Sequence, residues 1–136
     1  MSVEREHRVG DFAFTVELRG AAPNCVAAED RWFPLATALT SAWGADGGLL
    51  AGLLEKRSGY SKEGAVGFNY SGDAPDEAPD GKVRVFFMDD RLTLERAFFE
   101  KAAVEFGLAA LARLRRDSLP ASGAVEKRLI AVLARI

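Results

Sequence analysis

The chain has 136 residues, of which 49% are apolar and 28% are charged, and its formal net charge is -2 at pH 7. This length and composition are typical of one soluble globular domain, so we expect residues 1–136 to form a single domain with its own core. The slightly negative charge argues against a general affinity for nucleic acid or for an anionic membrane surface.

The cysteine content and the N-terminal residues indicate the compartment. Cys25 is the only cysteine, so no internal disulfide can form, which favours a reducing environment. The start of the chain lacks the apolar stretch of a secretory signal, and no apolar run approaches the roughly 20 residues of a membrane span. We therefore expect a cytoplasmic protein.

Residues 11–19 alternate between apolar and polar side chains, with Phe12, Phe14 and Val16 on one face, which predicts a half-buried strand. Residues 24–43 give a weaker pattern. The segment VAAEDRWF could begin a helix, and PLATALTSAW could form a second one, because proline is tolerated in a first turn.

The segment ADGGLLAGLLEKRSG predicts a helix. Asp46 is placed to act as its N-cap, and Gly59 suits the position after its last turn. Its apolar face consists of four leucines, Leu49, Leu50, Leu53 and Leu54.

Two further strands are predicted near residues 64–70 and 82–88. Phe86 and Met88 make the second strand apolar on both faces, which is typical of a central, covered strand. Since an acidic stretch connects the two strands, we expect an antiparallel pair with a long turn.

The longest predicted helix lies near residues 94–116, with Thr93 as its cap and Glu95 in its first turn. A terminal amphipathic helix follows, with its apolar stripe at Val125, Leu129, Val132 and Ile136. We therefore predict an α+β fold, in which a small, mostly antiparallel sheet packs against a long central helix, with further helices. The predicted core contains Phe14, Val16, Leu53, Phe68, Val85, Phe87, Phe99, Phe106 and Leu111.

The reactive side chains give weak signals. His7 is the only histidine and lies in a charged stretch, which is typical of a solvated side chain. A Cys–His nucleophile pair would require the fold to bring Cys25 to His7, and a small buried thiol is the simpler interpretation. The glycines of GADGGLLAG do not have the spacing of a phosphate-binding loop.

The segment NYSGDAPDEAPDGKVRVFFMDD carries six carboxylates: Asp73, Asp76, Glu77, Asp80, Asp89 and Asp90. Its spacing does not match a calcium-binding EF-hand loop, so we expect no metal there. The remaining interpretations are a solvated loop, an acidic docking surface, and a catalytic carboxylate pair at Asp89 and Asp90, which would need a pocket and shifted pKa values.

Residues 58–106 resemble immunity proteins that guard bacteria against contact-dependent growth inhibition toxins and related polymorphic toxins. The resemblance is carried by the GYS and GF-Y-G motifs, the acidic turn with its prolines, the V-V-F-DD strand and the helix containing FFEKA. It implies a cytoplasmic, non-catalytic protein without a cofactor, which binds and neutralises one cognate toxin domain, commonly a nuclease. The six carboxylates are then the expected toxin-binding residues.

An alternative function is a small-molecule-binding or regulatory α+β domain, with Trp32, Trp43, Tyr60 and Phe68 lining a cleft. The usual role of aromatic residues at such intervals is in the core, and the charge complementarity of an acidic surface with a basic nuclease favours the toxin-binding interpretation.

Overall fold

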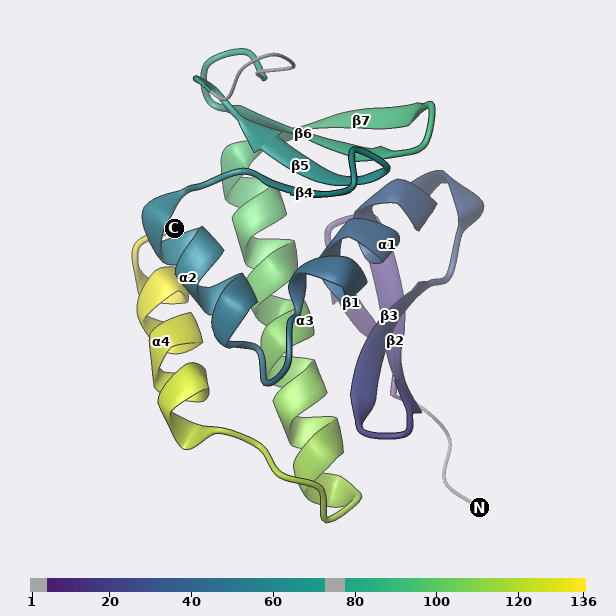
Figure 1. Ribbon diagram of the computed structural model, residues 1–136, viewed down its shortest axis with the longest axis vertical. Helices are drawn as coiled ribbons and strands as arrows, with labels where there is room; N and C mark the ends of the chain where they lie inside the picture. Colours follow the sequence, from purple (N-terminus) through teal and green to yellow (C-terminus); the bar gives the residue numbers. More distant parts are fainter. Residues whose placement is uncertain (1–4, 73–77) are drawn as a thin grey trace.

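The computed structural model describes residues 5–72 and 78–136 (Figure 1). Its strands form two antiparallel sheets, one with the order β1-β2-β3 and one with the order β4-β5-β6-β7. In chain order the elements are β1 (His7–Val9), β2 (Phe12–Arg19), β3 (Ala22–Ala27), the 3-10 helix η1 (Asp30–Trp32), α1 (Phe33–Ala42), α2 (Gly48–Lys56), β4 (Tyr60–Lys62), β5 (Val66–Tyr70), β6 (Lys82–Phe87), β7 (Asp90–Glu95), α3 (Arg96–Arg116) and α4 (Gly123–Ala134). The predicted α+β class is confirmed.

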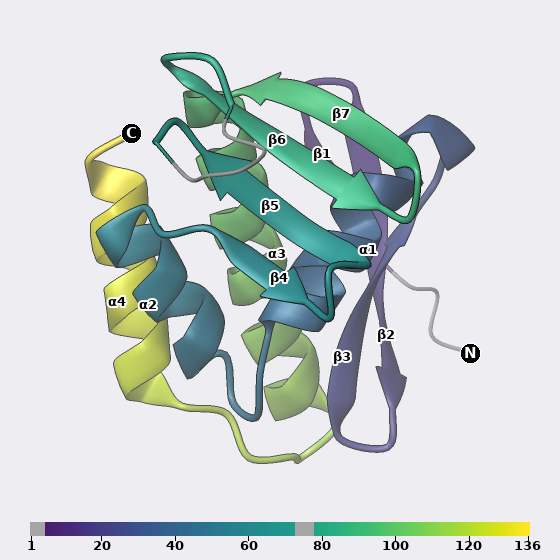
Figure 2. The same ribbon diagram turned by 45° about the horizontal axis from the view of Figure 1, so that its top comes forward.

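Helix α3 is the axis around which the other elements are arranged. Figure 1 shows the four-stranded sheet across one end of α3, the three-stranded sheet on one side, and α2 with α4 on the other side. Helix α1 packs against β3 as well as against β5 and β6, so it joins the two sheets (Figure 2). The core lies between these layers and α3.

The strands predicted near residues 11–19, 64–70 and 82–88 are present as β2, β5 and β6, but β2 lies in a different sheet from the other two. The sequence does not predict β3, which we read as a possible helix start. Gly20, with a φ of 62°, turns the chain so that β3 pairs antiparallel with β2. This pairing overrides the local helical pattern, and the helix begins only at Phe33, with Pro34 in its first turn as predicted.

Thr93 does not cap the long helix. It lies in β7 opposite Arg84 of β6, and α3 begins after Glu95. The physical reason is the tight turn at Met88 and Asp89, which folds β7 back onto β6 and pairs all six of its residues.

The ends of α2 differ from the prediction. Gly47 is the N-cap residue, although Asp46 still accepts a hydrogen bond from the Gly48 N–H at 2.9 Å. The left-handed residue that ends the helix is Arg57, with a φ of 50°, and not Gly59. This position of Arg57 matters for the site described below.

The core follows the prediction closely. Seven of the nine predicted core side chains are buried, and the other two, Leu53 and Phe87, are half-buried against the same core. Helix α4 buries the predicted stripe except for Ile136, which is 42% exposed. Gly107 lets α4 approach closely, because a Cβ atom there would lie 2.6 Å from Leu129 Cδ1.

We predict that Phe106→Ala lowers the free energy of unfolding by about 3–5 kcal/mol, because Phe106 is fully buried and packs edge-on against Phe14 and Trp43. The measurement is urea unfolding followed by circular dichroism. Leu49→Ala, at a leucine that is 44% exposed, is the control and should cost far less. Equal losses in the two variants would contradict this description of the core.

Candidate functional site

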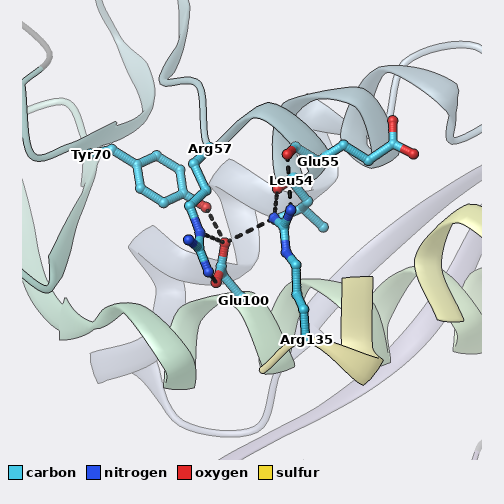
Figure 3. A network of polar contacts seen from close by, with 6 residues as sticks. All are labelled: Leu54, Glu55, Arg57, Tyr70, Glu100 and Arg135. Atoms are coloured by element: carbon cyan, nitrogen blue, oxygen red, sulfur yellow. Dashed lines mark hydrogen bonds and ion pairs between the residues drawn. The ribbon is translucent and has the colours of Figure 1, made fainter. Parts of the chain in front are cut away.

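A buried carboxylate, Glu100, is the centre of the main polar cluster (Figure 3). Its side chain is 1% exposed. Arg57 donates to both carboxylate oxygens, at 3.2 and 3.3 Å, and the Tyr70 hydroxyl donates at 3.1 Å. A second guanidinium group, that of Arg135, lies 3.5 Å from Oε2. We call these four residues the Glu100 cluster.

Four different elements supply the Glu100 cluster. Glu100 lies near the start of α3, Tyr70 is the last residue of β5, and Arg57 and Arg135 directly follow α2 and α4. Arg135 also donates to the backbone carbonyls of Leu54 and Glu55 in the last turn of α2, where carbonyl groups lack the full set of helical partners. The cluster therefore ties the ends of two helices and one strand to α3.

The electrostatic effects agree with this geometry. Burial, and then the negative charge of Glu100, raise the pKa of Tyr70 well above its usual range, so the phenol remains a hydrogen-bond donor. The hydrogen bonds that Arg57 donates to the Glu100 carboxylate raise the pKa of Arg57. Because these donors occupy the carboxylate oxygens, we interpret Glu100 as a structural link between elements.

A cavity of about 240 Å³ opens beside the Glu100 cluster. Its wall includes Arg57, Arg96 and Arg135, together with Glu95 and Glu100. Cations and carboxylates thus face each other across the same space, and Glu95 is also paired with Lys82 of the neighbouring strand. The mixed charge of this wall does not indicate a particular ligand.

The predicted toxin-binding residues fall into separate places. Asp80, Asp89 and Asp90 are exposed, whereas Asp73, Asp76 and Glu77 lie outside the described residues. Asp80 precedes β6 and accepts a hydrogen bond from the Ser71 hydroxyl at 2.7 Å, while the other two follow β6. The six residues of β6 span about 20 Å, so the described acids stand at opposite ends of one strand.

Asp89 and Asp90 belong to an unusual turn. Met88 precedes them with a φ of 53°, a conformation that costs a side chain other than glycine roughly 1–2 kcal/mol. Its backbone is held on both sides, since the Met88 N–H donates to Ala65 at 2.7 Å and its carbonyl accepts from Arg91 at 3.3 Å. Its side chain is nevertheless 62% exposed.

A second exposed apolar side chain lies at the same end of the sheet. Phe33 is 49% exposed, and its ring packs edge-on against Phe87 at 5.1 Å between centroids. We define the Met88 surface as Phe33, Phe87, Met88, Asp89 and Asp90. It combines an exposed apolar centre with adjacent carboxylates, a combination that the sequence prediction missed because only the acids were considered.

Cys25 and His7 do not form a pair. They lie on β3 and β1, which flank β2 on opposite sides, so the two backbones are separated by about two strand spacings, near 10 Å. Burial raises the pKa of the Cys25 thiol well above its usual range. His7 stacks on Phe14, and burial lowers its pKa.

The aromatic residues considered for a ligand cleft pack against other rings. Trp43 contacts Phe106, and Phe68 lies between Tyr60 and Phe99. Trp32 packs against Phe12 and Phe98, although its buried Nε1–H has no hydrogen-bond acceptor among the described residues. These contacts support the core interpretation of the aromatics.

Within residues 5–72 and 78–136, no three His, Cys, Asp or Glu side chains gather closely enough to hold a metal ion. In the same part of the chain, no helix has the length and hydropathy to cross a membrane. No protein-family model, curated protein sequence or solved structure matches this chain.

We predict that Glu100→Gln lowers the free energy of unfolding by about 2–3 kcal/mol, because it removes the charge that both guanidinium groups face. This value is below that of a fully buried pair, since Arg57 and Arg135 are 38% and 36% exposed. Tyr70→Phe should cost about 1–2 kcal/mol.

Glu105→Gln is the matched control for Glu100→Gln, because it makes the same change on the same helix at a half-buried position outside the cluster. It should alter the free energy of unfolding by less than about 0.5 kcal/mol. Urea unfolding of all three variants is the measurement, and a Glu100→Gln variant as stable as the control would refute the linking role of Glu100.

We also predict that Cys25 in the folded protein reacts with iodoacetamide at least about tenfold more slowly than in concentrated urea, because burial both shields the thiol and suppresses the thiolate. Mass spectrometry of samples quenched at intervals measures the two rates. Similar rates in the two conditions would show that the thiol is accessible in the fold.

Proposed function

We propose that the protein is a non-catalytic binding protein that neutralises a basic toxin domain in the cytoplasm, as the immunity proteins that residues 58–106 resemble would do. The observation that carries this proposal is the Met88 surface, where an apolar side chain is held exposed in an unfavourable backbone conformation beside two carboxylates. Strain of this kind tends to persist where it serves a function.

The chemistry of the Met88 surface suits a protein partner. Interfaces commonly place apolar anchors at the centre and charged groups at the rim, and methionine adapts its shape to the surface that it meets. Phe33 and Met88 can fill the central role, and Asp89 and Asp90 the rim role. A basic nuclease surface would complement the rim.

The exposed acids Asp80 and Asp89 lie at opposite ends of β6, and this limits how one partner could contact both. Asp80 lies about 20 Å from Asp89, at the other end of β6. One partner that contacts both ends would have to extend along the whole hairpin. We therefore assign the main contact to the Met88 surface, and a secondary role to Asp80.

We predict that, if the product of the neighbouring gene is the toxin, the double variant Asp89→Asn, Asp90→Asn slows association with that product, because rim charges mainly steer the encounter. Association of the unaltered protein should also slow as salt rises. Met88→Gly should instead speed dissociation, while its thermal midpoint stays equal or rises, since glycine relieves the left-handed strain.

Surface plasmon resonance at two ionic strengths measures both rates. Glu17→Gln is the control, because Glu17 is an exposed acid on β2, in the other sheet and away from the Met88 surface. If the toxin domain binds with unchanged rates in all variants, the binding site lies elsewhere. If it does not bind the unaltered protein at all, the proposed function is wrong.

A further inference from the structure

Strand β7 is the outer edge of the four-stranded sheet (Figure 2). It pairs with β6 on one side only, and no other described element donates a backbone hydrogen bond to it or accepts one from it. An edge strand of six residues thus presents unpaired N–H and C=O groups, which another strand could pair with. Proteins usually protect such edges, and here the residues themselves suggest what covers it.

The segment DRLTLER, residues 90–96, has a charge pattern that inverts about its centre. At equal distances on either side of Thr93, the residues are Leu92 and Leu94, then Arg91 and Glu95, then Asp90 and Arg96. Two antiparallel copies of β7, centred on Thr93, therefore place Arg91 of each copy opposite Glu95 of the other, while Arg96, the first residue of α3, lies just beyond the paired strand. Cross-strand pairs of opposite charge and Thr–Thr pairs are both favourable in antiparallel sheets.

We propose that the protein self-associates through β7, with two copies pairing antiparallel about a two-fold axis at Thr93, so that the two four-stranded sheets become one continuous sheet. A symmetric dimer requires a surface that is complementary to itself, and the inverted charge pattern meets this requirement. A strand from an unrelated protein would have no reason to carry the matching pattern.

The orientation of the side chains fits this arrangement. Leu92 and Leu94 are half-buried on the core face of β7, opposite Val85 and Val83, and pairing would bring each beside its counterpart on the second copy. Thr93 and the charged residues beside it are exposed on the other face. The core face and the charged face would thus each continue across the junction.

The neighbouring registers are unfavourable. If the two-fold axis lay at Leu92 or Leu94, the two faces would stay aligned, but Thr93 would stand opposite Arg91 or Glu95 of the second copy and both Arg91–Glu95 pairs would be lost. Register is therefore specified by the charges as well as by the alternation of the faces.

Existing contacts leave the charged groups free to pair across the junction. Glu95 is bound to Lys82 but remains 67% exposed, and Arg91 is exposed while it donates to the Met88 carbonyl. The paired segment begins at Asp90, which it shares with the Met88 surface, whereas Met88 and Asp89 lie outside the paired segment. Since one strand is a small contact, we expect a dimer that dissociates on dilution rather than an obligate one.

The test is sedimentation velocity of the full chain alone over a range of concentrations, so its result does not depend on the proposed toxin partner. The unaltered protein should show a concentration-dependent dimer that weakens as salt rises. Arg91→Glu and Glu95→Arg should each raise the dimer dissociation constant on the order of tenfold or more. The reason is that the two-fold axis makes each substitution create two like-charge pairs in the dimer.

The mixture of the two variants gives the sharpest outcome. In a mixed dimer, the position altered by Arg91→Glu on one copy faces the position altered by Glu95→Arg on the other, so the charges there are again opposite. The other Arg91–Glu95 pair of the mixed dimer is unaltered. The 1:1 mixture should therefore recover a dimer that neither variant forms well alone. Lys62→Glu is the control, because it reverses an exposed cation on β4, at the opposite edge of the same sheet, and should leave the dimer unchanged.

Three outcomes would overturn the proposal. They are a monomer throughout the concentration range, a dimer that both charge reversals leave unaffected, and a mixture that associates no better than its components. Circular dichroism and thermal unfolding of each variant establish that it is folded before its association is interpreted.

Discussion

The buried carboxylate of Glu100 is the interaction on which the arrangement of the rest depends. A carboxylate that is 1% exposed would be severely destabilising without donors, so α3 can bury it only where donors meet it. Those donors come from the end of β5, the end of α2 and the end of α4. Most residues of α3 between Ala102 and Leu114 are apolar, so this part of the helix could pack in several rotations, and the need to bury Glu100 among its donors selects one of them.

The same requirement positions the sheet that carries the candidate surface. Tyr70 ends β5, and β5 pairs with β6, so the hydrogen bond to Glu100 anchors the hairpin of β6 and β7 relative to α3. Phe68, two residues earlier, packs on Phe99 at 4.8 Å between centroids and reinforces the same junction. The Met88 turn and the edge of β7 therefore belong to a hairpin that is fixed at its other end. Because this hairpin is already ordered, it would lose little conformational entropy on binding a partner.

Periodicity predicted the parts of the fold in which local pattern and tertiary packing agree. The strand at Phe14, the helix at Phe106 and the core between them follow from spacing alone. The failures occur where pairing competes with a local helical pattern, as in β3 and at Thr93. The sequence analysis also missed Glu100, whose donors come from distant parts of the chain. The available signal was its spacing, because Glu100 lies three residues before Ala103 and seven before Gly107, on a buried face of α3.

The β6–β7 hairpin contains two features that do not contribute to the stability of the fold, a left-handed methionine and a long open edge. Glycine would suit the left-handed position of Met88 better, and a shorter or covered edge would be safer than six open residues. Neither feature belongs to the core that the Glu100 cluster holds together. Because a well-anchored core can tolerate such local costs, the hairpin can keep an exposed methionine at its turn and an inverted charge pattern along its edge. The two contacts that we propose, one with a basic toxin domain and one with a second copy, would thus use neighbouring parts of a single hairpin.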